Sequence, residues 1–143
     1  MSRFAYDDAT LRRVLDETKT VTLVGASPRG EKRASWRVMR FLQQRGYKVY
    51  PVNPDAVGQE IHGEAVLASL ADVPEPIDMV DIFRRSSQVA PMVDDAIAAG
   101  AKFIWMQLDV VDETAAAKAE AAGMTVIMDR CPAIELPRLD AAA

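Results

Sequence analysis

The sequence predicts an α/β fold: a single domain over residues 1–143, in which a doubly wound, mainly parallel sheet of about five strands lies between helices. Two observations lead to this fold class. Short apolar segments with strand character alternate with amphipathic segments of helical spacing along the chain. The apolar segments are nearly continuous, which is typical of parallel strands buried on both faces and joined by right-handed helical crossovers.

The strongest local signal is a strand, a glycine turn and a helix start within residues 21–35. Residues 21–24 are apolar, and Ser35 is expected to be the N-cap of a helix that reaches about residue 45. Gly25, Ser27 and Gly30 stand where the motif G-x-G-x-x-G has its glycines. Free N–H groups and the positive end of the helix dipole then face one point, which favours phosphate binding. A turn without a ligand is the alternative.

The remaining elements follow the same alternation. A leading helix is expected over 7–17, and residues 55–73 are less regular, with room for a short strand and a helical turn. Ser86 or Ser87 is expected to cap a helix that ends before Gly100, and Asp112 one that ends before Gly123. The tail over 132–139 is expected to be extended or a short helix. The other strands are expected at 48–52, 78–83, 102–106 and 125–128.

Composition excludes several classes of function. The formal net charge of −4 argues against broad nucleic-acid binding. No apolar run approaches transmembrane length, and the first residues lack the core of a signal peptide, so no membrane association is expected. Cys131 is the one cysteine, which favours a cytoplasmic location. His62 is the one histidine, so neither a catalytic triad nor a histidine metal cluster is expected, and no metal site is predicted.

The predicted ligand carries more negative charge than a pyrophosphate. An NAD site usually has an acidic residue after the second strand, but Asp55 lies beyond Pro54 and is expected to point elsewhere. The glycine loop and the following helix carry four cationic residues, which would suit the additional ribose phosphate of NADP or coenzyme A (CoA). These are Arg29, Lys32, Arg33 and Arg37. Solvated loop charges are an equally good interpretation.

Five segments together resemble a known family. They are Val-Gly-Ala-Ser-Pro at 24–28, Gly-Tyr-Lys-Val-Tyr-Pro-Val-Asn-Pro at 46–54, Asp-Ile-Phe-Arg at 81–84, Trp-Met-Gln-Leu at 105–108 and Asp-Arg-Cys-Pro at 129–132. Their order and spacing resemble the stand-alone CoA-binding domains that are similar to the N-terminal domain of the succinyl-CoA synthetase α subunit. The resemblance spans roughly residues 21–139 and implies a Rossmann-like sheet with CoA as the cofactor.

The resemblance also implies a site. Gly25, Ala26 and Ser27 would contact the pyrophosphate, Arg33 and Ser35 would add phosphate contacts, Val52, Asn53 and Pro54 would line the adenosine pocket, and Phe83 and Arg84 would flank the ligand. Gln107 directly follows a strand and is therefore expected at the same edge. The chain departs from the family at Asp109, where a glycine is usual; an inward carboxylate there would repel phosphate.

Three functions follow from these observations. The preferred one is a small cytoplasmic protein that binds CoA or acyl-CoA and has no catalytic residues of its own. The alternatives are an NAD(P)-dependent oxidoreductase and the CoA-binding subunit of a split acyl-CoA synthetase, whose protein partner is unknown. Cys131 is either an inert buried thiol or, with its thiolate favoured by Arg130, a thiol that the CoA thiol can reach to form a mixed disulfide under oxidation.

Overall fold

A five-stranded parallel sheet forms the centre of the protein, as predicted. The computed structural model describes residues 5–142; the outermost residues of the predicted domain, 1–4 and 143, lie outside this description. The strand order is β2-β1-β5-β6-β7, and every neighbouring pair is parallel. The direction of winding reverses between β1 and β5, which is the switch point where doubly wound folds bind ligands.

The strands agree with the apolar runs to within one residue at each end. They are β1 (Thr20–Val24), β2 (Lys48–Val52), β5 (Met79–Ile82), β6 (Phe103–Met106) and β7 (Thr125–Ile127). All residues of β1, β5 and β6 are buried. Burial on both faces explains why these strands show no alternation of polar and apolar residues.

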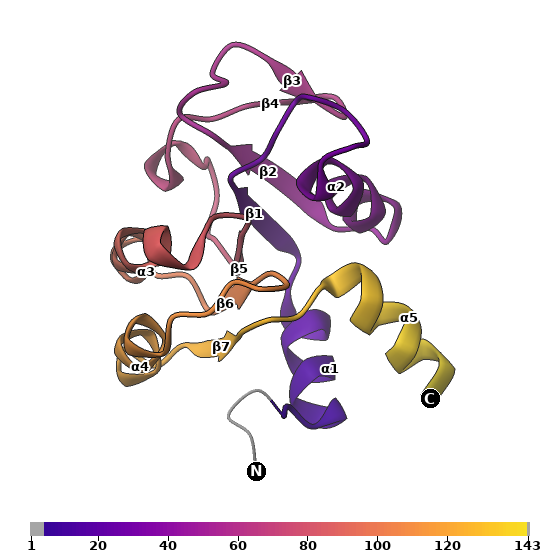
Figure 1. The fold of residues 1–143 in the computed structure, drawn as a ribbon, viewed down its shortest axis with the longest axis vertical. Helices are drawn as coiled ribbons and strands as arrows, with labels where there is room; N and C mark the ends of the chain where they lie inside the picture. The colour runs from indigo at the N-terminus through magenta and orange to yellow at the C-terminus, as the bar shows by residue number, and fades with distance from the viewer. Residues whose placement is uncertain (1–4, 143) are drawn as a thin grey trace.

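Helices cover both faces of the sheet (Figure 1). α1 (Asp8–Glu17), α2 (Ala34–Gln44) and α5 (Pro132–Ala142) pack in one hydrophobic cluster with Val21 and Leu23 of β1. α3 (Val89–Ala98) and α4 (Glu113–Ala121) pack in a second cluster, which contains Val24. Successive strand residues point to opposite faces, so a single strand contributes to both clusters.

Two predicted helix caps are wrong. Arg33 is the N-cap of α2, whereas Ser35 is its second residue, and the Ser35 hydroxyl oxygen accepts a hydrogen bond from the Ser27 amide at 3.1 Å. Residues Ser86–Gln88 form a 3₁₀ turn, η2, ahead of α3, and the Ser86 hydroxyl donates to the Asp109 carbonyl at 3.3 Å. Asp112 does cap α4 through its side chain, as predicted.

The less regular segment contains a hairpin and a helical turn. β3 (Glu60–Ile61) and β4 (Glu64–Ala65) pair antiparallel, and η1 (Leu70–Asp72) follows them. His62 lies in the turn of this hairpin, where its ring packs against Trp36 at 4.2 Å between centroids. Its Nε2 also lies 2.9 Å from the Trp36 carbonyl, so His62 holds the hairpin against α2. Of the two alternatives for the tail, the helix is observed.

Asp81 is a polar residue inside the sheet. It lies in β5 between Leu23 of β1 and Trp105 of β6 and is fully buried. Its Oδ1 accepts a hydrogen bond from Gln107 Nε2 at 2.8 Å, whereas Oδ2 has no partner among residues 5–142. Burial disfavours the charged carboxylate and raises the pKa of Asp81 to about 7.

This pKa predicts a pH dependence of stability. Between about pH 4 and pH 7 the folded state holds a proton that the unfolded state has released, so the free energy of unfolding falls as the pH rises through this window. Asp81→Asn removes the titration and should remove this part of the pH dependence. Urea unfolding of wild type and Asp81→Asn from pH 4 to pH 8 measures the free energy of unfolding. The same pH dependence in both proteins would contradict the raised pKa of Asp81.

Candidate functional site

The candidate site lies at the carboxyl ends of the strands, next to the switch point. Two adjoining hollows open there, a smaller one of about 480 Å³ beside the glycine loop and a larger one of about 880 Å³ between α2, β6 and α5. Ala34, Phe83 and Arg84 line both. The two hollows therefore adjoin at these three residues.

Gly25 brings the ends of β1 and β5 close together. Its φ is +88°, and a Cβ atom placed on it would lie 2.3 Å from the Phe83 carbonyl oxygen and 3.2 Å from Arg84 Nε. Both the left-handed conformation and the missing side chain are therefore required at this position. The approach fixes Phe83 and Arg84 beside the glycine loop.

The first amides of the loop are already occupied. Gly25 and Ala26 both donate their N–H groups to the Val52 carbonyl, at 2.9 and 3.3 Å. Asn53 Nδ2 donates to the Ala26 carbonyl at 2.8 Å, and Asn53 Oδ1 accepts from the Asp55 amide. Val52 and Asn53 thus hold the loop in shape, and donors for a phosphate have to come from residues further along it.

Side chains near the start of α2 offer such donors, because the amides of Ser27, Arg29 and Arg33 are also occupied. Ser27, Arg29, Arg33 and Ser35 line the smaller hollow together with Ala34. The first N–H groups of a helix have no acceptor within the helix and carry its positive dipole end. Arg33 is exposed and at the N-cap, so its guanidinium and this helix end present positive charge to the same hollow.

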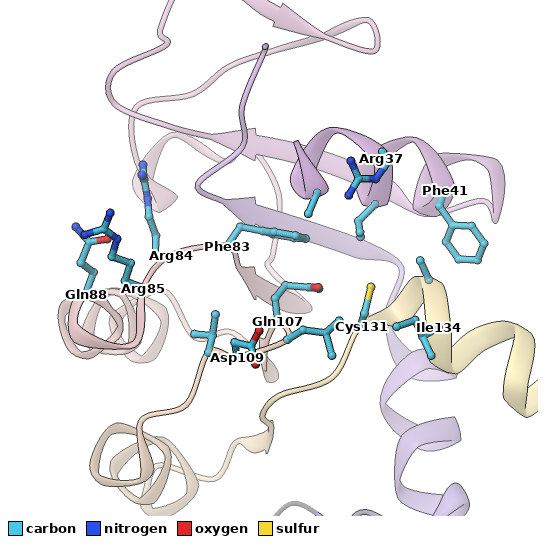
Figure 2. A pocket seen from close by; sticks show the side chains of 15 residues that line it. Arg37, Phe41, Phe83, Arg84, Arg85, Gln88, Gln107, Asp109, Cys131 and Ile134 are labelled. Carbon is cyan, nitrogen blue, oxygen red and sulfur yellow. The ribbon is translucent and has the colours of Figure 1, made fainter. Parts of the chain in front are cut away.

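Arg84 and Phe83 form the wall between the two hollows. An Arg84 guanidinium nitrogen donates to Asn53 Oδ1 at 3.3 Å, which joins the end of β5 to the end of β2. Figure 2 shows the Phe83 ring extending across the larger cavity above Gln107, while Arg84 points away toward the loop. The two consecutive side chains therefore point in different directions from the boundary between the hollows.

Most of the predicted site residues meet here. The smaller hollow is lined by Gly25, Ser27, Arg33, Ser35, Asn53, Phe83 and Arg84, and the larger one by Gln107 with Phe83 and Arg84. Ala26 and Val52 are buried beneath the loop, Pro54 is exposed, and none of the three lines a hollow. The structure gives Ala26 and Val52 a role in shaping the loop.

The sequence also missed residues of the smaller hollow. Asp55, Ala56 and Gln59 line it, so the expectation that Asp55 points elsewhere is wrong. The turn after β2 is tight, with the Ala56 amide donating to the Asn53 carbonyl, and it returns Asp55 to the site. Of the predicted cations, Lys32 lines neither hollow and Arg37 lines the larger one.

The larger cavity has an apolar wall, and the side chain of Gln107 brings a polar group to it. Val38 and Phe41 come from α2 and Ile134 from α5, whereas Gln107 reaches the cavity from the end of β6 (Figure 2). Gln107 is 6% exposed, and its Nε2 is held by Asp81. The remaining side-chain oxygen points toward the space between Phe83 and Cys131 (Figure 2).

Cys131 faces this cavity with a protonated thiol. It is 7% exposed, and Figure 2 shows its sulfur directed into the cavity. Burial raises the pKa of Cys131, so the predicted stabilisation of a thiolate is wrong. The Arg130 guanidinium donates to the Asp129 carbonyl and lies over the Tyr6 ring at 5.4 Å, which gives it other partners than the thiol.

Asp109 occupies a position that suits glycine. Its φ is +66°, a conformation in which aspartate is one of the tolerated non-glycine residues. Its amide donates to Asp129 Oδ1 at 2.7 Å. Asp109 lines the larger cavity and not the smaller one, so its carboxylate lies away from the predicted phosphate contacts.

Within residues 5–142, no three histidine, cysteine, aspartate or glutamate side chains are grouped so that they could hold a metal ion. Over the same residues, no helix is long and apolar enough to cross a membrane.

Comparison with known proteins identifies the family. Residues 19–137 match the family model described as CoA binding domain. The chain belongs to this family. An uncharacterized protein of Bacillus subtilis (strain 168), YneT, is 35% identical over 123 residues, which cover 86% of this chain and 89% of YneT. The resemblance stated from the sequence motifs is thereby confirmed.

Solved structures share the fold of this chain. A hypothetical protein from Pyrococcus horikoshii OT3 superposes with a TM-score of 0.89 at 36% identity and covers 97% of this chain and 96% of its own. A dinucleotide-forming acetyl-coenzyme A synthetase 1 from Ca. Korarchaeum cryptofilum superposes with a TM-score of 0.67 at 30% identity. That match covers 81% of this chain and 26% of the synthetase, so similar folds make up nearly all of one solved chain and about a quarter of another.

Two glycines allow the close approach to be tested against a matched control. Gly25 and Gly30 both have positive φ, but only Gly25 would place a Cβ against the backbone. Gly30→Ala should destabilise the fold by about 1–2 kcal/mol through the strained conformation. Gly25→Ala should destabilise the fold by about 1–3 kcal/mol more than Gly30→Ala does, because its Cβ would also clash with the Phe83 carbonyl oxygen. Urea unfolding measures both; equal losses would show that the Phe83 contact is unimportant.

The buried thiol predicts slow alkylation. Because the pKa of Cys131 is raised, its labelling by iodoacetamide at pH 7.5 should be slower than that of a free cysteine peptide and should increase well above pH 9. Acetyl-CoA should slow it further if the arm of the ligand fills the cavity, whereas adenosine 3′,5′-bisphosphate, which lacks the arm, should not. Intact mass spectrometry follows the reaction; rapid labelling at neutral pH would contradict the burial of the thiol.

Proposed function

We propose that this protein binds coenzyme A or an acyl-CoA across the two adjoining hollows. The observation that carries the proposal is that a phosphate-type hollow lies next to a larger, mainly apolar cavity at the switch point, in a chain of the CoA-binding family. CoA has the same division, with a charged nucleotide at one end and a long neutral arm at the other.

The smaller hollow suits the nucleotide. Ser27, Ser35 and the N-terminus of α2 lie where a pyrophosphate would accept hydrogen bonds, and Arg29 and Arg33 supply positive charge for a further phosphate. Asn53 borders the same hollow from the end of β2. The adenosine is proposed to lie on this side.

The larger cavity suits the pantetheine arm. The arm would pass Phe83 and reach Cys131, and the Gln107 side-chain oxygen is placed to accept a hydrogen bond from an amide N–H of the arm. The Asp81 contact fixes the orientation of the Gln107 amide. A mixed disulfide between Cys131 and the CoA thiol remains a prediction, tested by intact mass after diamide and CoA with Cys131→Ser as control.

We infer a binding role without catalysis by this chain, in the cytoplasm. His62 is engaged with Trp36, and Cys131 is protonated, so neither supports a nucleophile–base pair. Hydrolysis of an acyl-CoA by the pure protein that is lost in a site variant would contradict this inference. A role as the CoA-binding subunit of a split synthetase is the second candidate, because a related domain makes up 26% of an acetyl-CoA synthetase chain.

An NAD(P) site is the alternative that binding measurements should exclude. Asp55 lines the smaller hollow, so a carboxylate is available there for ribose hydroxyls. Native mass spectrometry of the purified protein identifies the nucleotide that co-purifies, and calorimetry compares CoA, dephospho-CoA and NAD. CoA should bind tightest; tighter binding of NAD would overturn the proposal.

Binding of the ribose phosphate of CoA should depend on Arg33. Arg33→Ala should weaken CoA about tenfold and dephospho-CoA less, since a hydrogen bond to a charged group contributes about 1.5–3 kcal/mol and exposure keeps the value low. Lys32→Ala, at a neighbouring cation outside both hollows, is the control and should change little. A higher salt concentration should reduce the difference in affinity between CoA and dephospho-CoA. Equal affinities of wild type for CoA and dephospho-CoA would remove this role of the loop.

A further inference from the structure

The larger cavity offers more space than the arm of CoA requires. Sites that enclose a whole drug-sized ligand have volumes of about 300–1,000 Å³. The larger cavity alone measures about 880 Å³, although the nucleotide is assigned to the separate hollow of about 480 Å³. Space therefore remains around the end of the arm.

The end of the cavity beyond Cys131 is apolar. Val38 and Phe41 of α2 form one side of it, and Ala133 and Ile134 of α5 form the other. Figure 2 places Phe41 and Ile134 at this end, while Arg85 and Gln88 lie at the opposite end. A chain that continues past the thiol thus meets hydrocarbon side chains.

Exposed apolar side chains cluster at the same cavity. Among residues 5–142 three large hydrophobic side chains are exposed, Val57, Leu108 and Ile134, and the last two line the cavity. Leu108 is 50% exposed and Ile134 51%. Their exposure at one site is unfavourable unless a ligand covers them.

Two lining arginines are held by other groups. The exposed Arg37 guanidinium donates to the Glu31 carbonyl, and Arg84 donates to Asn53. Both keep their positive charge, but the side chains that form the end itself, Val38, Phe41, Ala133 and Ile134, carry none. An uncharged hydrocarbon chain is the chemistry that this end matches.

We propose that the apolar end binds the acyl group of an acyl-CoA, and that this group is a short- to medium-length hydrocarbon chain. The proposal rests on the proposed function, because the thioester must be held near Cys131 by a bound CoA moiety. It adds the class of acyl group, which follows from the lining of the cavity.

Calorimetry with CoA, acetyl-, butyryl-, hexanoyl- and succinyl-CoA tests the proposal on the full chain. Affinity should increase about two- to fourfold for each methylene, the upper value corresponding to full burial. Succinyl-CoA should bind more weakly than butyryl-CoA, which has the same chain length without the second carboxylate. Equal affinity along the series, or tightest binding of succinyl-CoA, would overturn the proposal while leaving CoA binding intact.

Substitutions at two exposed residues distinguish an effect on the acyl pocket from a general effect on the protein. Ile134→Ser should reduce the gain per methylene by more than it changes the affinity for CoA itself. Val57→Ser, at a residue 56% exposed and outside both hollows, should leave the whole series unchanged. An undiminished chain-length dependence in Ile134→Ser would place the acyl group elsewhere and overturn the proposal. If wild type binds none of these ligands, the proposed function is overturned as well.

Discussion

The contact between Gly25 and the Phe83 carbonyl is the constraint on which the site depends. It allows the ends of β1 and β5 to meet at the switch point, where the Phe83 amide also donates to the Val24 carbonyl at 2.8 Å. Phe83 and Arg84 leave β5 at this contact and separate the two hollows. A side chain at residue 25 would therefore alter both hollows at once, because both residues line each of them.

The hydrogen bonds of the glycine loop divide its residues into two groups. The Val52 carbonyl accepts from Gly25 and Ala26, and the Asn53 side chain bonds the loop, the next turn and Arg84. These contacts make the loop rigid before any ligand arrives, which lowers the entropy that binding has to overcome. A glycine-rich motif therefore marks residues that shape the loop as well as residues that touch a ligand.

The accuracy of the sequence-based predictions follows the range of the interactions involved. The strands were predicted to within one residue because apolar runs bounded by glycine or proline are local signals. Most of the residues predicted for the site line the two hollows because parallel strands end at one edge. The cap at Ser35 was predicted wrongly because its hydroxyl accepts from Ser27, eight residues away. The larger cavity could not be predicted, since helix packing brings Phe41 and Ile134 together.

The buried pair of Asp81 and Gln107 connects the core to the cavity. Placing a carboxyl group in the middle of a parallel sheet is unfavourable, and the protein reduces the cost by favouring the neutral form and by one hydrogen bond. That bond fixes the Gln107 amide, so its oxygen remains an acceptor beside the apolar wall. An acceptor between a charged rim and a hydrocarbon end matches the proposed ligand, which is ionic, then amide, then apolar along its length. The polar pair in the core thus fixes the position of this acceptor along the cavity.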